Sequence, residues 1–160
     1  MAAVAHSGGC RVMVRLALFV GAGQVGNALI RWWTNDPASH CELVVDGWCY
    51  SSSLMDGGVR RKRVGPGADE ISLTPDKWVL IELPWADAQQ VLAYFEQTEG
   101  TPYGWASLIL SQLFNLNRRV EGSEFCSEWS AAALGLPAPS SLNPGALRDW
   151  CTYLGGHALA

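Results

Sequence analysis

A histidine at the start of an apolar run is the first feature of this sequence that could do chemistry. His40 lies in residues 39–45 (SHCELVV), a pattern typical of a strand. Because side chains two apart on a strand share a face, His40 and Glu42 are expected to point the same way. A carboxylate on that face can accept a hydrogen bond from one ring nitrogen and leave the other free to act as a base. A surface His–Glu pair on an edge strand is the alternative.

A cysteine at the start of a helix-like segment is the second such feature. Cys126 lies in a pattern that predicts a helix over about residues 124–134, with the thiol in the first turn. The helix dipole and the unpaired N–H groups there favour an anion, and the pKa of a thiol can fall from ~8.5 to roughly 3.5–7.5 in such settings. The same amides could hold an oxyanion. A small buried hydrophobe, the usual role of a free cysteine, is the alternative.

The other four cysteines are expected to be structural. Cys41 should face the core, because neighbouring residues of a strand point to opposite sides. Five cysteines without a C-x-x-C pair suggest neither a zinc ribbon nor a disulfide framework, so we expect no metal, no cofactor and a reducing compartment. The remaining three are Cys10, Cys49 and Cys151.

The overall composition predicts one compact domain that is made and kept in the cytoplasm. We expect residues 13–160 to fold together and residues 1–12 to be disordered. A net charge of −4 gives no general attraction to nucleic acid or to an anionic membrane. The longest apolar stretch, residues 12–30, is interrupted by polar residues and glycines, which argues against membrane insertion or a signal peptide. The basic run 60–63 predicts a solvated hairpin arm, with a site for an acidic or phosphorylated group as the alternative.

The elements that must position these residues are strands followed by helices. That order favours an α+β fold, with a small antiparallel sheet packed against helices. Turns are predicted at Asp46-Gly47 and at residues 56–58. The predicted strands are 13–20, 39–50 (broken by the first turn), 59–64 and 77–83, and the predicted helices are 23–33, 85–99, 103–114, 124–134 and 144–154.

A glycine motif at residues 21–26 (GAGQVG) suggests a different function. It matches G-x-G-x-x-G after a strand, and Asp46 follows at the distance from which an acidic residue could meet a ribose. However, the helix that follows is short for a crossover between parallel strands, and no β-α-β alternation continues. A turn with close backbone packing is the favoured interpretation, with dinucleotide binding or a loop beside the active cleft as the alternatives.

Three short motifs then follow one another in an informative order. They are His-x-Glu-apolar-apolar at residues 40–44, Gly-x-x-Tyr-Gly-Trp at residues 100–105 and Phe-Cys-Ser-Glu at residues 125–128. Over roughly residues 14–150 the sequence resembles the permuted branch of the NlpC-like papain-fold superfamily. That branch includes YiiX-like and YebB-like bacterial proteins and, more distantly, lecithin:retinol acyltransferases. One departure is Trp129, where a smaller aliphatic residue is more usual.

The resemblance implies a circularly permuted papain-like fold, in which the histidine strand precedes the cysteine helix. It implies Cys126 as nucleophile, His40 as general base and Glu42 as the residue that orients the base. Tyr103 resembles an aromatic residue beside the cleft, with plain packing as the alternative. The implied activity is thiol hydrolysis or acyl transfer through an acyl-enzyme, on peptides, peptidoglycan fragments or acyl lipids. A binding module on the same fold, without turnover, is the second function that we consider.

Overall fold

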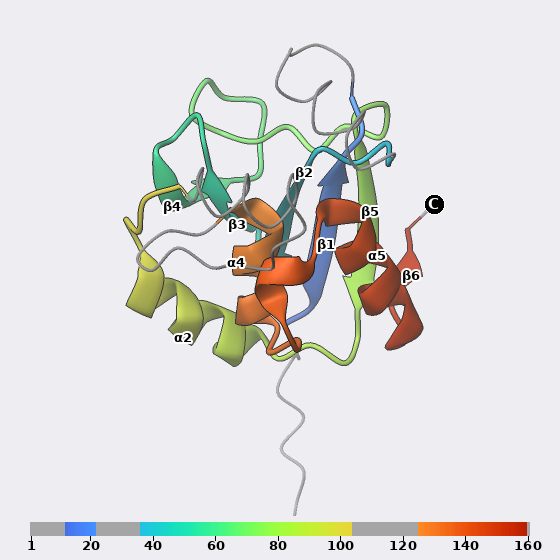
Figure 1. Cartoon of the computed structure of the whole chain (residues 1–160). Helices are drawn as coiled ribbons and strands as arrows, with labels where there is room; N and C mark the ends of the chain where they lie inside the picture. Colours follow the sequence, from blue (N-terminus) through green and yellow to red (C-terminus); the bar gives the residue numbers. More distant parts are fainter. Residues whose placement is uncertain (1–11, 22–35, 104–124, 160) are drawn as a thin grey trace, which may run out of the picture.

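The computed structural model describes residues 12–21, 36–103 and 125–159 (Figure 1). Five strands precede the helices along this part of the chain, as the sequence predicts. The strands are β1 (Val14–Phe19), β2 (His40–Val45), β3 (Trp48–Ser53), β4 (Gly58–Arg63), β5 (Trp78–Leu83) and β6 (His157–Ala158). The helices are α2 (Ala88–Thr98), α4 (Cys126–Ala133) and α5 (Pro144–Tyr153), with a short 3-10 turn at Pro139–Ser141.

The strands form one antiparallel sheet of six strands in the order β4-β3-β2-β1-β5-β6. β1 lies at its centre and pairs along its full length with β2 on one side and β5 on the other. The α+β class and the antiparallel sheet predicted from the sequence are therefore confirmed. Because β1 and β2 run antiparallel, they do not form the parallel unit that a dinucleotide-binding glycine motif requires.

The turn between β2 and β3 is the two-residue hairpin that the sequence predicts. Asp46 and Gly47 both have positive φ, 47° and 75°, as the favoured hairpin turns demand. Asp46, the residue that could have met a ribose, thus serves the turn. Most of the glycine motif, residues 22–26, lies outside the described residues.

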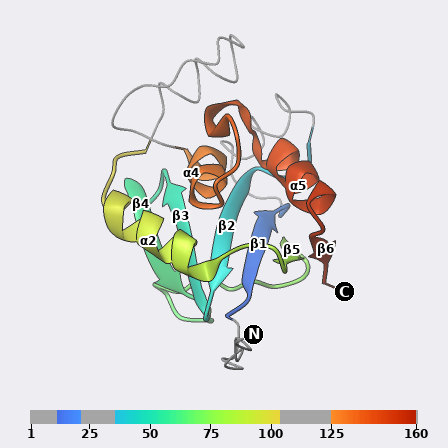
Figure 2. The same cartoon turned by 90° about the horizontal axis from the view of Figure 1, so that it is seen from below.

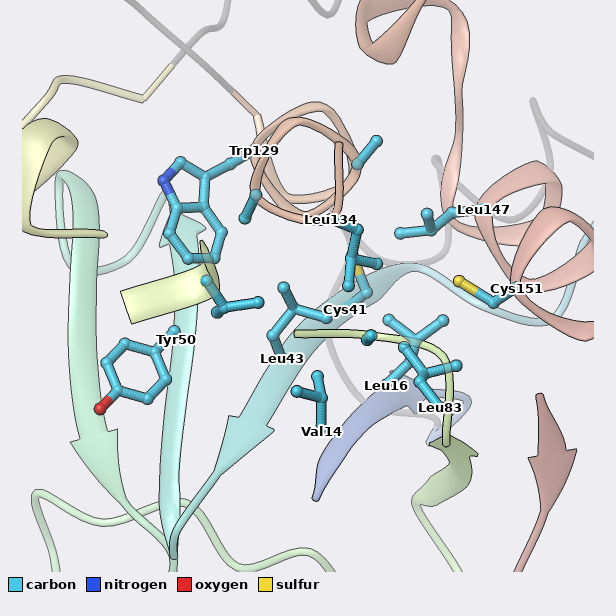
Figure 3. Close-up of a cluster of buried hydrophobic side chains, with 14 of the residues drawn as sticks. Val14, Leu16, Cys41, Leu43, Tyr50, Leu83, Trp129, Leu134, Leu147 and Cys151 are labelled. Carbon is cyan, nitrogen blue, oxygen red and sulfur yellow. The ribbon is translucent and has the colours of Figure 1, made fainter. Parts of the chain in front are cut away.

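All three helices cover the same face of the sheet (Figures 1 and 2). The main hydrophobic core fills the space between that face and the helices (Figure 3). Leu16, Leu43 and Leu83 point into it from the central strands, and Trp129 and Leu147 meet them from α4 and α5. The alternation of the strands places Cys41 in the same core, as expected from the sequence.

The opposite face of the sheet is also partly covered. Ala17, Val44 and Cys49 are buried there, against side chains of the segment between β4 and β5 and of β5 itself. Ile71 and Trp78 are among these covering residues. Burial on both faces explains why β1 and β2 have near-continuous apolar sequences and not a strict alternation.

Several predicted boundaries need correction. α2 begins at Ala88 and not at residue 85, because the Asp87 carboxylate accepts a hydrogen bond from the Gln89 amide (2.9 Å) and caps the helix there. α4 begins at Cys126, and the terminal strand β6 was not predicted. Residues 1–11 of the predicted disordered stretch 1–12 lie outside the described residues, as do the predicted helix 23–33 and the part of the predicted helix 103–114 beyond Tyr103. None of the described helices has the length and apolar character needed to cross a lipid bilayer.

Candidate active site

His40 and Glu42 project from the same face of β2, as their spacing predicts. Nε2 of His40 lies 2.7 Å from Oε1 of Glu42. The Glu42 side chain is only 1% exposed, whereas that of His40 retains 22%. The contact engages one ring nitrogen and leaves Nδ1 available for a second partner. The alternative of a solvated surface pair is therefore wrong.

Glu42 also accepts a bidentate pair of hydrogen bonds from Arg60 of β4. Nη1 of Arg60 lies 2.7 Å from Oε2, and Nη2 lies 2.6 Å from Oε1. Burial by itself would raise the pKa of the Glu42 carboxyl, but the hydrogen bonds from Arg60 and His40 outweigh it, so the pKa lies below its ordinary value. The carboxylate is thus held in its charged form.

Arg60 corrects the prediction for the basic run 60–63. Its side chain is 15% exposed, and its Nε donates to Asp56 at 2.8 Å, so it is not a solvated arm. Arg61 and Arg63 are exposed and lie over the Trp48 ring on the other face of the strand. Because side chains alternate along the strand, Arg60 points to the face that carries Glu42, whereas Arg61 and Arg63 point to the other face. The composition of the run alone does not distinguish these positions.

Cys126 is the first residue of α4, in the first turn as the sequence predicts. It is 5% exposed, and its thiol lies within hydrogen-bonding reach of both the Cys41 thiol and the His40 ring. The hydrogen bond from Cys41, followed by the charge and the hydrogen bond of His40, lowers the pKa of the Cys126 thiol against the opposing effect of burial. The N–H groups of the first helical turn, which have no carbonyl partner within the helix, favour the same anion.

The pKa of His40 shifts in the opposite direction. Burial would lower the pKa of the ring, but the Cys126 thiolate and then Glu42 outweigh burial and raise it to about 10. A lowered thiol pKa beside a raised imidazole pKa favours a thiolate–imidazolium pair. The structure therefore brings Cys126, His40 and Glu42 together in one chain of contacts.

The contact between Cys126 and β2 arises where β2 separates from β3. The two strands pair only over Leu43–Val45, and beyond that point the Ser51 hydroxyl donates to the Cys41 carbonyl (2.7 Å). The Cys41 sulfur lies 3.6 Å from Oγ of Ser130, one helical turn after Cys126 on the same side of α4. α4 thus lies against β2 with its first turn near the His40 end.

Cys41, like Arg60, is a residue of the site that sequence reasoning missed. The alternation rule placed it correctly in the core, and we interpreted that position as purely structural. Its pKa is raised well above the ordinary value, first by burial and then by the neighbouring Cys126 thiolate, so it stays protonated as a donor. The signal that could have found it is the core position of Cys41 itself, because helices that pack on the sheet cover its core face.

Tyr103 also lies near the thiols. Its backbone amide donates to the Gly57 carbonyl (3.3 Å), which holds it beside the start of β4. Burial, and then the negative charge at Cys126, raises its pKa. The structure therefore places Tyr103, the predicted substrate-binding residue, close to the Cys126 thiol. The rest of its motif, Gly104-Trp105, lies outside the described residues.

The chemistry available at this site is that of thiols, imidazole and carboxylate. All four cysteines in the described ranges are free thiols: Cys41, Cys49, Cys126 and Cys151. Across those same ranges, no group of three or more His, Cys, Asp or Glu side chains is arranged to hold a metal ion. The arrangement can generate a nucleophile, orient its base and stabilise an oxyanion.

Comparisons of the chain with family models, with curated proteins and with solved structures find no match.

Proposed function

We propose that this protein is a cysteine hydrolase or acyltransferase, with Cys126 as nucleophile, His40 as general acid and base, and Glu42 as the residue that orients His40. The observation that carries the proposal is the meeting of the Cys126 thiol with His40, whose Nε2 lies 2.7 Å from Glu42. Residues 40 and 126 come from a strand and a helix far apart in the sequence. Titratable groups with perturbed pKa values cluster at functional sites.

We also propose that the chain has a circularly permuted papain-like fold. Support comes from the order of the elements, since the strand with His40 precedes the helix with Cys126. Further support comes from the packing of that helix against an antiparallel sheet. The motifs at residues 40–44, 100–105 and 125–128 resemble the same superfamily. Part of the proposal is a cytoplasmic location, where thiols remain reduced and reactive.

The chemistry follows the positions of the three side chains. The Cys126 thiolate attacks an amide, ester or thioester carbonyl, and amides of the first turn of α4 stabilise the oxyanion. His40 gives its proton to the leaving nitrogen, oxygen or sulfur as the bond between that atom and the carbonyl carbon breaks, which leaves a thioester on Cys126. His40 then takes a proton from water or another acceptor as it attacks the thioester, and Cys126 is released. Glu42 keeps the ring in place throughout.

The substrates we propose are peptides, peptidoglycan stem peptides, isopeptides or acyl lipids. Tyr103, near the nucleophile, could contact the acyl part of such a substrate. Mass spectrometry of the intact protein after exposure to one representative of each class would detect an acyl adduct. An adduct that is present in the wild type and absent in Cys126→Ser identifies both the nucleophile and the substrate class.

The thiolate itself provides the first test. Its ultraviolet absorbance, measured against pH as the difference between wild type and Cys126→Ser, should show Cys126 ionised below neutral pH. In His40→Ala the midpoint should rise toward the ordinary ~8.5, because the imidazolium is gone. Cys49 and Cys151 do not interfere, since burial raises the pKa of each to about 12.

Turnover on any substrate that forms an adduct should fall roughly 10²–10⁴-fold in His40→Ala. Cys151→Ser, a buried thiol of α5 outside the site, is the matched control and should keep full turnover. If Cys126 titrates as an ordinary thiol in both the wild type and His40→Ala, the proposed function is wrong. A thiolate that forms no adduct with any of the substrates would instead favour a binding module.

A further inference from the structure

The charge on Glu42 needs a partner that the three proposed catalytic residues do not supply. The carboxylate is buried, 1% exposed, and an uncompensated charge in such a place is costly. His40 reaches only Oε1, at 2.7 Å. Arg60 contacts both oxygens, at 2.7 and 2.6 Å, in the planar fork geometry that matches a carboxylate.

Arg60 is itself fixed in position from the opposite side. Its Nε donates to Asp56 at 2.8 Å while both terminal nitrogens donate to Glu42. Asp56 also binds Lys62 at 2.6 Å, so the acid that holds Arg60 has a second cation of its own. All the donors of the guanidinium that face the site are thereby directed at carboxylates.

The charged and titratable groups that face this cluster come from every element around it. Glu42 is faced by Arg60 of β4, by His40 on its own strand and by the neutral thiol of Cys49 on β3. Cys126 of α4 is faced by His40, by the protonated Cys41 of β2 and by the neutral Tyr103. With Arg60 positive, Glu42 negative, His40 positive and Cys126 negative, the charges of these four side chains sum to zero.

We propose that Arg60 is a positioning residue of the active site, which neutralises Glu42 so that the positive charge of His40 is left to face the Cys126 thiolate. This inference rests on the proposed function and extends the site by one residue. Without Arg60, the remaining three groups would carry one net negative charge in a buried place. They would relieve it by taking up a proton, and the thiolate is the group that can accept one while the His40–Glu42 pair stays intact.

The test compares Arg60→Met with variants that separate charge from geometry. The readout is the midpoint of the Cys126 thiolate absorbance, taken as the difference from the same protein with Cys126→Ser. Arg60→Met should raise the midpoint by about 1–3 pH units. Arg60→Lys keeps the positive charge but loses the bidentate hydrogen-bond geometry. Its Cys126 midpoint should lie between those of Arg60→Met and wild type. Arg63→Met, which removes an exposed cation of β4 on the face away from Glu42, should match wild type.

The double variant Arg60→Met/Glu42→Gln distinguishes this role from plain stabilisation. It removes both charges together, so the remaining pair, His40 and Cys126, is again neutral as a whole, and the midpoint of Cys126 should return toward the wild-type value. A purely structural Arg60 would give no such recovery. If Arg60→Met proves unable to fold, Arg60→Lys and the double variant still test the inference.

The inference and the proposed function can fail separately. If wild-type Cys126 is a thiolate and its midpoint is unchanged in Arg60→Met, the role of Arg60 is overturned and the proposed function stands. The same holds if the midpoint in the double variant is raised as far as in Arg60→Met. If wild-type Cys126 titrates as an ordinary thiol, the function fails. Arg60 is then judged by NMR titration of His40 in Cys126→Ser, where adding Arg60→Met should raise the His40 pKa. An unchanged His40 pKa overturns the inference.

Discussion

At the scale of single residues, the second thiol distinguishes this site from a simple Cys–His pair. The Cys41 thiol is a donor to Cys126, and it is held in place by contact with Ser130 at 3.6 Å. A neutral donor stabilises a thiolate without adding a charge that would need compensation. Its hydrogen bond is the leading cause of the lowered pKa of Cys126.

Replacing Cys41 with alanine should therefore raise the pKa of the Cys126 thiol and slow its alkylation at acidic and neutral pH. We expect the rate with iodoacetamide to fall several-fold to about tenfold at a pH below the new pKa, as loss of one hydrogen bond to a charged group implies. Peptide mass spectrometry measures the rate at each cysteine. Cys151→Ala, a similar loss of a buried thiol in α5, should leave the rate unchanged, and an unchanged rate in Cys41→Ala would contradict the prediction.

At the scale of elements, the position of α4 decides whether the site exists. Trp129, one turn into this helix, is fully buried, and its indole Nε1 donates to Oγ1 of Thr98 on α2 at 2.9 Å. The ring also packs against Tyr94, with centroids 5.8 Å apart. The Trp129 side chain thus links α4 to α2.

Trp129→Phe should lower the free energy of unfolding by about 1–3 kcal/mol, through the lost hydrogen bond and imperfect repacking. Thr98→Val, which keeps the indole but removes its acceptor, should cost a similar amount if the hydrogen bond is the main cause. Urea unfolding measures both. Trp150→Phe, at a tryptophan that is 39% exposed on α5, is the control and should change stability by less than about 0.5 kcal/mol. If Trp150→Phe lowered the free energy of unfolding as much as Trp129→Phe, the special role of Trp129 between α4 and α2 would be contradicted.

At the scale of the whole molecule, the buried charge network links stability to pH. Hydrogen bonds from Arg60 and His40 hold the pKa of Glu42 below its ordinary value, and those from Arg60 and Lys62 overcome burial to hold the pKa of Asp56 at about 2. A carboxyl whose folded pKa is depressed contributes stability above its unfolded pKa, ~4, and loses it as pH falls through the folded value.

We therefore expect the free energy of unfolding to fall as the pH is lowered from about 4 toward 2. Glu42→Gln should be less stable at neutral pH and show a flatter decline in that window, because the side chain no longer takes up a proton on unfolding. Urea midpoints at a series of pH values measure both slopes. Glu96→Gln, at an exposed position of α2, should keep the wild-type slope, and an equally steep slope in Glu42→Gln would contradict the linkage.

By itself, the sequence determined whatever depends on neighbouring residues. Strand alternation predicted that His40 and Glu42 share a face, turn chemistry predicted the hairpin at Asp46-Gly47, and helix periodicity predicted that Cys126 lies in a first turn. Local rules failed where a tertiary contact decides. The start of α2 depends on the side chain of Asp87 that caps it, and β6 is a two-residue strand defined by its pairing with β5.

Only the tertiary structure decided which charges meet. Arg60 and Glu42 belong to β4 and β2, which are separated by β3, and the Glu42 carboxylate comes within reach because both side chains rise from the same face of a closely packed sheet. Cys41 and Cys126 meet because α4 packs on the other face, near the point where β2 and β3 separate. Such contacts depend on register and packing between distant segments, and a one-residue slip would direct each side chain to the wrong face.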